Sequence, residues 1–221
     1  MKKFKSIILT VAFSLVFFAC EQEMTELKPN VYNPAGTPSG DSGSADFSKF
    51  VTIGGSFTAG LMDGTLNTSG QMHSVGKMIN NQLQLAGGSS TFNQPDINSE
   101  NGYLGPGPDG VAGTSDDQGK TYLTISASTG AIGIGFSQGD VASVATPYSG
   151  DKSALNNFAF PNSVMGMYLT AAAGGPNVAQ NPAFNSFFAR FDASGATVSP
   201  LGQFIGSGGS FFMSWLGFSD F

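Results

Sequence analysis

Residues 50–60 read Phe50-Val51-Thr52-Ile53-Gly54-Gly55-Ser56-Phe57-Thr58-Ala59-Gly60, and this stretch decides the fold class of the chain. The aromatic and β-branched run over 50–53 is typical of a short buried strand, and the two glycines that follow end it. The serine therefore comes directly after the carboxyl end of a strand. In open α/β folds, ligands bind at that end of the sheet.

An amphipathic helix is predicted downstream of this strand. Four apolar residues recur there at intervals of four, four and three residues, which places them on one face of a helix: Val75, Ile79, Leu83 and Ala86. Ser74 is suited to cap the start of this helix, and Gly87-Gly88 terminates it. A strand, a glycine turn and then a helix form the opening of a parallel α/β unit.

Later segments extend this α/β prediction. Residues 122–126 and 132–136 alternate apolar and polar side chains around a Thr-Gly turn, which predicts a β-hairpin within an insertion at about 90–150 that covers part of the main sheet. We expect a second core strand over 153–160 and a helix over 184–191 whose aromatic residues pack in the core rather than line an acyl pocket. The apolar run 211–216 is typical of a central parallel strand covered on both faces.

The composition fits one loop-rich globular domain. The chain has 221 residues, of which 31 are glycine and only 11% are charged. Ordinary domains carry about 7% glycine and about 25% charged residues. These values exclude a coiled coil and a disordered acidic tail. A single cysteine excludes a disulfide-stapled mini-protein.

The first twenty residues predict export and lipid attachment. Three lysines precede an apolar run over 7–19, which is too short to span a bilayer and is typical of a signal peptide over residues 1–19. The following Cys20 lies in a context that resembles a relaxed bacterial lipobox, where the cysteine becomes lipidated; a buried thiol in an uncleaved anchor is the alternative. Residues 20–45 then form a polar tether, whose early glutamates resemble the export signal of Bacteroidetes surface lipoproteins. We expect the protein in the cell envelope, at the outer membrane, held there through Cys20.

Charge excludes nucleic acid as a partner. The whole chain carries 9 basic and 15 acidic residues, and removal of the signal peptide takes away three of the lysines. Nucleic-acid binding requires a basic surface that displaces counterions from phosphates, and the sequence offers none. A lone cysteine and a lone histidine cannot form a zinc site, and no phosphate-binding glycine loop ending in lysine is present. We expect no cofactor.

Ser56 is the candidate nucleophile. It lies in a glycine-rich turn where its hydroxyl can be exposed and where backbone N–H groups can approach an oxyanion. Position +2 is Thr58, so the Gly-x-Ser-x-Gly elbow of α/β-hydrolases is not met. A purely structural serine in a turn is the alternative interpretation.

Two blocks of the sequence resemble the SGNH (GDSL) hydrolase family. Residues 53–60 resemble its first block, Gly-Asp-Ser-Leu-Thr-x-Gly, and residues 215–220, Trp215-Leu216-Gly217-Phe218-Ser219-Asp220, resemble its Gly-x-Asn-Asp block. The glycine- and proline-rich insertion, Asn181-Pro182 and Phe188-Ala189-Arg190-Phe191 look like lipoprotein members of the family from Bacteroidetes. The resemblance covers roughly residues 47–221.

This resemblance implies a flavodoxin-like parallel sheet with flanking helices and hydrolysis of carboxylic esters through an acyl-enzyme. Ser56 would be the nucleophile, and its own N–H would be one oxyanion donor. A backbone N–H near Asn162 would be the second donor, and Ser219, which replaces the family's asparagine, the third. Gly55 in place of aspartate and Phe57 in place of leucine depart from the family pattern.

The resemblance assigns no residue of this sequence as the general base. Serine needs a positioned imidazole, which the family carries in a C-terminal Asp-x-x-His block that this sequence lacks. We interpret the only histidine, His73, as a half-exposed residue at a helix start, and Asp220 has no imidazole after it to orient. We expect either a truncated chain with little activity of its own or a degenerate surface lipoprotein that binds glycans or proteins. The apolar run near the last residue favours truncation.

A calcium site is one interpretation of the turn-rich stretch over 98–119. Asp109, Asp116 and Asp117 could offer oxygen ligands, but their spacing does not match an EF-hand loop. The sequence favours a solvated loop over a metal site.

Overall fold

The computed structural model describes residues 40–217 and residue 220. The predicted signal peptide, Cys20, the tether up to residue 39 and Ser219 therefore lie outside the described residues. Within the described part, no helix combines the length and the apolar character needed to cross a membrane.

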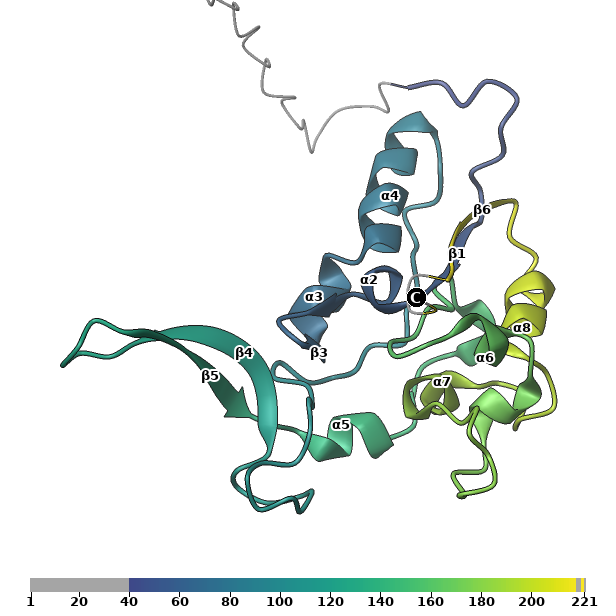
Figure 1. Cartoon of the computed structure of the whole chain (residues 1–221). Helices are drawn as coiled ribbons and strands as arrows, with labels where there is room; N and C mark the ends of the chain where they lie inside the picture. Colours follow the sequence, from purple (N-terminus) through teal and green to yellow (C-terminus); the bar gives the residue numbers. More distant parts are fainter. Residues whose placement is uncertain (1–39, 218–219, 221) are drawn as a thin grey trace, which may run out of the picture. The chain divides into compact units, whose positions relative to one another are not determined.

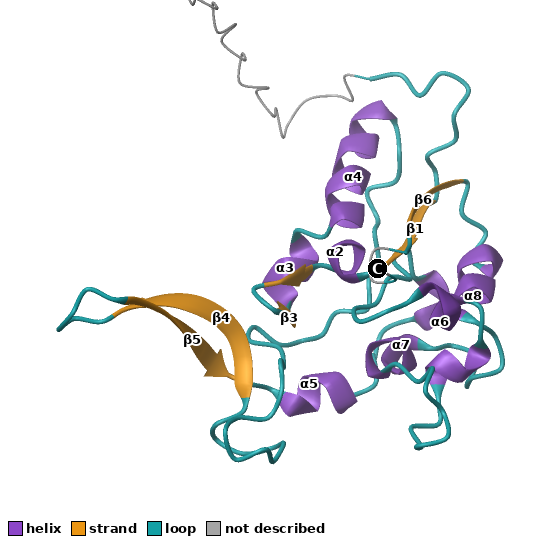
Figure 2. Cartoon of the chain, in the orientation of Figure 1, coloured by secondary structure: helices purple, strands orange, loops and turns teal. Residues whose placement is uncertain are grey.

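The described residues form an α/β structure in which short elements alternate with long loops, as Figure 2 shows. The strands are β1 (Phe50–Gly54), β2 (Leu61–Met62), β3 (Thr65–Leu66), β4 (Gln118–Ile125), β5 (Ile132–Gln138) and β6 (Phe211–Trp215). The α-helices are α2 (Ser56–Ala59), α3 (Thr68–Met72), α4 (Val75–Leu83), α5 (Val141–Ala145), α6 (Met165–Tyr168), α7 (Ser186–Phe191) and α8 (Pro200–Gly206). Single 3-10 turns are η1 (Gln84–Ala86), η2 (Lys152–Ala154) and η3 (Ala171–Gly174).

Strand β1 is fully buried and pairs in parallel with β6, in a register that places Phe50 beside Phe211 and Gly54 beside Trp215 (Figure 1). The predicted first strand is therefore confirmed. Parallel pairing aligns the carboxyl ends of both strands at the same edge of the sheet. This edge is where the sequence places the candidate nucleophile.

An extended segment lies along the other side of β1. The Thr52 N–H donates to the Asn156 carbonyl at 2.7 Å, and the Phe158 N–H donates to the Thr52 carbonyl at 2.8 Å. The Phe160 N–H then donates to the Gly54 carbonyl at 3.1 Å. The predicted strand over 153–160 is therefore present only as an extended segment with a single parallel bridge between Thr52 and Asn157, and its first residues form η2.

The main hydrophobic core joins β1 to this segment and to α6 and α7. Its buried members are Ile53, Leu155, Phe158, Phe160, Tyr168, Ala173, Phe188 and Phe191. The ring of Phe160 lies 4.7 Å from that of Tyr168 and 5.3 Å from that of Phe188. The predicted aromatic helix is confirmed as α7, and its Phe188 side chain has no exposed surface.

Helix α4 forms where the apolar periodicity predicts it. The Ser74 hydroxyl accepts from the Lys77 N–H at 3.2 Å, and Gly87 adopts the left-handed conformation after η1, so the predicted cap and terminator are confirmed. The closest approach to β1 is made at a glycine, because a Cβ at Gly76 would lie 2.9 Å from the Thr52 hydroxyl. This small residue lets the helix axis come near the strand.

Strand β6 differs from the prediction of a central strand covered on both faces. Its large side chains are exposed, with Phe211 at 39%, Phe212 at 63% and Trp215 at 45%. The apolar run indicated the strand and its parallel pairing correctly. The predicted cover is wrong within residues 40–217, because successive side chains of a strand stand on opposite faces and both Phe211 and Phe212 are exposed. At its edges, β6 pairs with β1 on one side and with no described strand on the other.

The hairpin is confirmed as β4 and β5, which pair antiparallel from Gln118 opposite Gln138 to Ile125 opposite Ile132. The prediction that it covers part of the main sheet is wrong, because its apolar side chains are exposed to solvent. Near its base, the Thr121 N–H donates to the Asp63 carbonyl at 2.9 Å, which attaches the ribbon to the turn between β2 and β3. From there it extends away from the helices (Figure 1).

A buried carboxylate makes part of the stability depend on pH. Burial of Asp192 at the end of α7 opposes ionisation, but hydrogen bonds from Ser194, Ala196 and Gln203 outweigh it and hold its pKa below the ordinary value. A lowered folded-state pKa stabilises the protein above the unfolded pKa of about 4, and this stability is lost as pH falls through the folded value.

We therefore expect Asp192→Asn to lower the free energy of unfolding at pH 7 by about 1–3 kcal/mol, because the amide nitrogen faces a backbone donor. The difference from the parent chain should shrink when urea unfolding is repeated at pH 3. Asp151→Asn is the control. Asp151 is exposed and accepts only from groups within its own turn, so the same change there should cost much less. Equal losses for both variants would contradict the prediction.

Candidate functional site

Ser56 is the first residue of α2 and follows β1 with only Gly55 between them. Its side chain is half-buried, and no hydrogen bond joins its hydroxyl to another residue of the described part. The hydroxyl is therefore available at the carboxyl end of the sheet. The sequence prediction of its position relative to the strand is confirmed.

Gly54 allows this sharp change from strand to helix. A Cβ at this position would lie 2.4 Å from the Thr58 hydroxyl and 2.8 Å from the Trp215 carbonyl oxygen. Both distances are shorter than real Cβ contacts, so only glycine fits. The close approach holds the first turn of α2 against the ends of β1 and β6.

A small pocket of about 10 Å³ opens beside Ser56. Its lining residues are Gly55, Ser56, Phe57, Thr58 and Trp215. The rings of Phe57 and Trp215 lie 6.1 Å apart, so one wall is aromatic although the two residues come from different ends of the chain. The pocket thus combines a hydroxyl with an apolar wall.

Asn162 lies in the turn that ends the segment beside β1. Its φ is +55°, in the left-handed region, where asparagine is among the few side chains found with some frequency. Its side chain is exposed, and no hydrogen bond from its N–H is seen among the described residues. The next residue reaches the turn that carries Ser56, because a Cβ at Gly55 would lie 3.4 Å from the Ser163 hydroxyl oxygen.

Tyr168 links the end of β1 to the turn that contains Ser163. Its hydroxyl lies 2.6 Å from the Gly54 carbonyl oxygen and 2.7 Å from the Ser163 hydroxyl oxygen. Burial raises the pKa of Tyr168, so the phenol stays protonated and can donate to the carbonyl. Sequence reasoning missed this residue, because nothing in its local pattern distinguishes it from an ordinary core tyrosine.

Asn157 is a second positioning residue that sequence reasoning missed. Its side chain is buried; its Oδ1 accepts from the Thr52 hydroxyl at 3.0 Å and its Nδ2 donates to the Thr58 carbonyl at 2.9 Å. It therefore ties the middle of β1 to the end of α2. A buried asparagine inside an apolar segment is a signal that could have indicated such a role.

The chain after β6 turns toward the same region. The Asp220 carboxylate accepts from the Met165 N–H at 2.9 Å, next to the Asn162 turn. Ser219 itself lies outside the described residues, so its predicted place among the oxyanion donors stays a prediction. The Asp220 carboxylate is engaged at the start of α6 and orients no imidazole in the described residues.

His73 is the C-terminal cap of α3, immediately before the cap of α4, and its ring is exposed. Its Nδ1 lies 2.8 Å from the Ser69 carbonyl oxygen, which can only accept, so this nitrogen donates. The ring thus has a local structural role, and no hydrogen bond joins it to Ser56 within residues 40–217.

The three aspartates weighed for calcium lie in a loop that they stabilise themselves. Asp116 accepts from the Thr114 hydroxyl at 2.6 Å and the Asp109 N–H at 3.1 Å, and Asp117 accepts from the Gly113 N–H at 2.7 Å. The Thr114 hydrogen bond comes first among the causes that lower the pKa of Asp116. The other oxygen of Asp117 is buried without a partner in the described part of the chain. No group of three or more potential ligands in the described residues is arranged for a metal ion.

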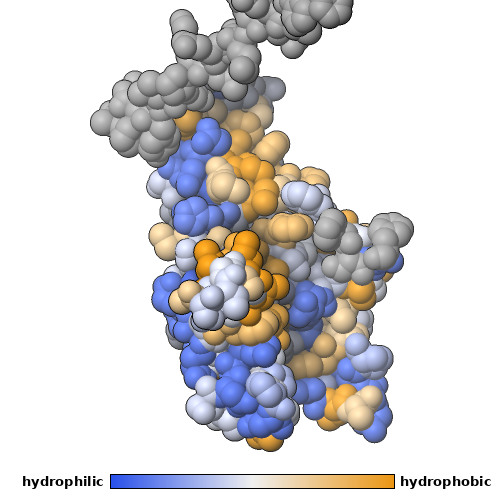
Figure 3. Space-filling model, turned by 60° about the vertical axis from the view of Figure 1, so that its left-hand side comes forward, coloured by the Kyte–Doolittle hydropathy of each residue, from blue (hydrophilic) through white to orange (hydrophobic). Residues whose placement is uncertain are grey.

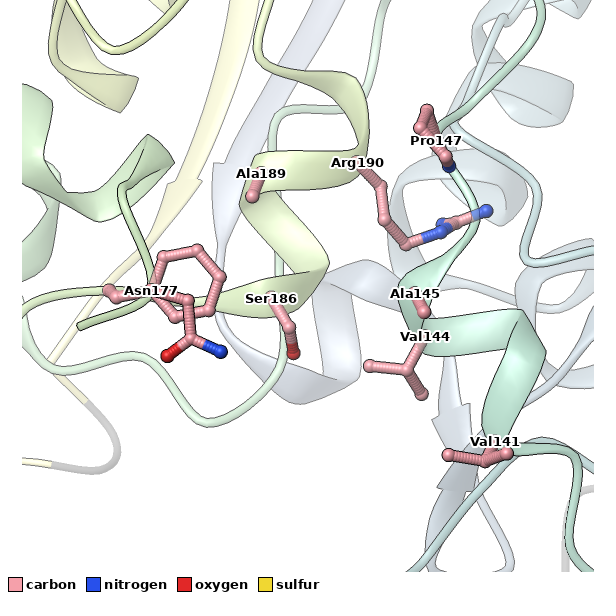
Figure 4. Close-up of a pocket in the computed structure, with 9 residues that line it drawn as sticks. Val141, Val144, Ala145, Pro147, Asn177, Ser186, Ala189 and Arg190 are labelled. Carbon is pink, nitrogen blue, oxygen red and sulfur yellow. The ribbon is translucent and has the colours of Figure 1, made fainter. Parts of the chain in front are cut away.

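A larger pocket of about 270 Å³ lies between α5 and α7 (Figure 4). Val141, Val144 and the chain of Arg190 line it, while Ser186 and Asn177 face it. The Arg190 guanidinium is used elsewhere, since it donates to the carbonyls of Thr146 at 2.9 Å and Asp96 at 2.8 Å. The pocket shares no lining residue with the one beside Ser56.

Comparison of the chain with protein-family models, with curated proteins and with solved structures found no match. The resemblance to SGNH hydrolases therefore rests on the sequence blocks alone and stays a prediction.

Proposed function

We propose that this chain is a serine ester hydrolase domain of SGNH type, with Ser56 as the nucleophile. The observation that carries the proposal is the position of Ser56: an unengaged hydroxyl that follows a fully buried parallel strand and lies beside an aromatic wall, in a hollow of about the size of one water molecule. Two segments distant in sequence meet at this point, the Asn162 turn and the end of β6.

The proposed chemistry is acyl transfer to serine. The Ser56 oxygen loses its proton as it attacks the ester carbonyl carbon, and the carbonyl oxygen becomes an oxyanion. When the tetrahedral intermediate collapses, the bond to the alcohol oxygen breaks and that oxygen takes up the proton that Ser56 lost. Water then attacks the acyl-serine and releases the acid. Backbone N–H groups of Ser56 and Asn162 are the candidate oxyanion donors, with the Ser219 hydroxyl as the third. Loss of one such donor costs about 10²–10³ in rate in a well-studied protease.

The strand arrangement supports the flavodoxin-like part of the proposal. The segment at 156–160 lies on one side of β1 and β6 on the other, and all three run in parallel. Along the chain, β1 is the first of these three, the segment at 156–160 is the second and β6 is the third, so their order in the sheet is 2-1-3. This is the start of the 2-1-3-4-5 order of flavodoxin-like sheets, in which ligands bind at the carboxyl edge beside the first strand. In the proposed fold, a further parallel strand would pair with the open edge of β6.

The described residues offer a nucleophile but no base. The His73 ring is hydrogen-bonded within α3, and the Asp220 carboxylate is hydrogen-bonded to α6. We therefore expect little turnover from this chain alone, since loss of the triad histidine costs on the order of 10⁶ in a well-studied protease. The substrate class is a small-molecule, lipid or glycan ester.

Covalent labelling tests the proposal without requiring turnover. We expect a fluorophosphonate probe at high concentration to modify Ser56, with the adduct located by peptide mass spectrometry, and Ser56→Ala to remove that adduct. The matched control is Ser186→Ala, since Ser186 also begins a helix and faces a pocket. This control should retain the Ser56 adduct in full.

Labelling spread over many serines, or equal labelling of Ser56→Ala and the parent chain, would sink the hydrolase proposal. The alternative would then be a non-catalytic surface lipoprotein that binds glycan or protein partners. The absence of an imidazole beside Ser56 in the described residues favours this alternative.

We also propose that the protein is attached to the cell envelope by acyl chains on Cys20. The supporting observations are the basic residues and apolar run that precede this cysteine and the polar stretch that follows it. The domain would then work close to a lipid surface, at the outer membrane.

A further inference from the structure

The hairpin formed by β4 and β5 has one strongly apolar face. Partner residues across the ribbon share a face, so the register places Leu123 with Ile134, Ile125 with Ile132, and Phe136 opposite Thr121 on the same side. The five apolar side chains of this face are 40% to 76% exposed. Figure 3, in which the hairpin comes forward, shows strongly hydrophobic surface gathered around its paler tip.

The opposite face of the same ribbon is polar. At Tyr122 and Thr124, only β4 contributes side chains to it, because the partner positions on β5 are glycines. Tyr122 lies across Gly135, since a Cβ at that glycine would be 2.8 Å from the tyrosine ring. Thr124 similarly covers Gly133, where a Cβ would be 3.0 Å from the threonine hydroxyl. The alternating glycines therefore belong to the polar face, and every large apolar side chain is directed to the other. The ribbon is amphipathic.

Charge is absent from the ribbon beyond its base. No charged residue occurs between Lys120 and Asp140, so the 19 residues from 121 to 139 are neutral. Charged residues lie only at the base, where Lys120 pairs with Glu100 at 4.0 Å. Exposed apolar patches of this kind mark interaction surfaces, and a two-stranded ribbon without a cover is marginal in water.

The size of the face argues against a second copy of the chain as the occupant. Two strands of seven to eight residues present a footprint of roughly 25 by 10 Å, and even with the relief of the side chains two copies packed face to face would bury at most about 1,000 Å² of accessible surface in total. Stable interfaces bury about 1,200–2,000 Å² in total. A lipid surface needs no matching shape, and water among the headgroups can satisfy the open edges of the ribbon, which hydrocarbon could not.

We propose that the hairpin binds lipid by laying its apolar face on a zwitterionic membrane surface, with the face that carries Tyr122 and Thr124 directed to water. The neutral ribbon would bind through apolar contact rather than through charge. An anionic surface would not favour it, because the chain is acidic, with a net charge of −6. This inference goes beyond the proposed function and depends on neither Ser56 nor acylation of Cys20.

Environment-sensitive reporters on the two faces test the proposal. The full chain with Cys20→Ser would carry one new cysteine labelled with nitrobenzoxadiazole: Ile134→Cys on the apolar face, Tyr122→Cys on the polar face, or Leu169→Cys outside the hairpin. Leu169 is 66% exposed, close to the 68% of Ile134, and so controls for adsorption of any exposed apolar site. Phosphatidylcholine vesicles would be added to each.

We expect a severalfold rise and a blue shift in emission only for the reporter at 134, unchanged by salt, and loss of both when Leu123→Asp is added. Leu123 is exposed, so this substitution leaves the fold intact. No response at 134, or an equal response at 134, 122 and 169, would overturn the proposal. A response at 134 that rises with protein concentration in the absence of vesicles would identify a second copy as the occupant and would overturn it as well.

Discussion

Phe188→Ala is expected to lower the free energy of unfolding by about 3–5 kcal/mol, the range for removing a buried aromatic ring. The Phe188 ring has no exposed surface, and its centre lies 5.3 Å from that of Phe160 and 5.2 Å from that of Phe191. The cavity would open between α7 and the segment at 156–160, which is hydrogen-bonded to β1. Each kcal/mol lowers the melting temperature of a domain of this size by about 2–4 °C, so calorimetry should show a loss of roughly 6–20 °C.

Phe212→Ala is the matched control for this prediction. It deletes the same ring from β6, where Phe212 is 63% exposed and has Phe204 as a ring neighbour at 6.0 Å. We expect a loss below about 1 kcal/mol, because little apolar surface is buried there. If the two variants melt at the same temperature, the core is not where the structure places it.

Local signals were sufficient to predict several elements of the fold. The β-branched run before Gly54 indicated β1, the helical spacing and Ser74 indicated α4 and its cap, and the Thr-Gly turn indicated the hairpin. Each of these signals acts through neighbours within a few residues. The backbone geometry follows from them before any tertiary contact forms.

Burial could not be predicted in the same way. An apolar run is equally compatible with a covered strand and with an exposed one, because the cover comes from other parts of the chain. For this reason the positions of β6 and the hairpin in the sequence were predicted correctly, but their predicted burial was wrong. The segment at 156–160 illustrates the reverse case, since asparagine side chains take part in holding it beside β1 and interrupt the apolar pattern of a strand.

Within the candidate site, the sequence predicted the backbone turns but not the side chains that hold them in place. Ser56 follows the strand end as expected, and the left-handed Asn162 occupies a turn where the resemblance expects glycine. Tyr168 and Asn157 could not be found, because their roles arise from hydrogen bonds to residues about 100 positions away. Such pairings leave no periodic trace in a single sequence.

Gly54→Ala should both destabilise the chain and abolish labelling of Ser56. The added methyl would lie 2.4 Å from the Thr58 hydroxyl and 2.8 Å from the Trp215 carbonyl oxygen, and neither can withdraw easily because Thr58 is buried and the carbonyl belongs to the backbone of β6. Overpacking of this kind costs about 1–3 kcal/mol, and we expect the upper end of that range. A displacement of Ser56 by about 1 Å would further reduce its reaction with a fluorophosphonate by about 10²-fold.

The neighbouring glycine supplies the control that separates crowding from simple loss of flexibility. A Cβ at Gly55 would meet only the Ser163 hydroxyl, at an ordinary 3.4 Å, and its φ of −86° lies outside the left-handed region that favours glycine. Gly55→Ala should therefore keep the melting temperature and the Ser56 adduct, and the SGNH resemblance, which has aspartate at this position, agrees that a side chain fits there. If Gly54→Ala and Gly55→Ala behaved alike in both measurements, the tight contact between α2 and the ends of β1 and β6 would not be what positions the Ser56 hydroxyl.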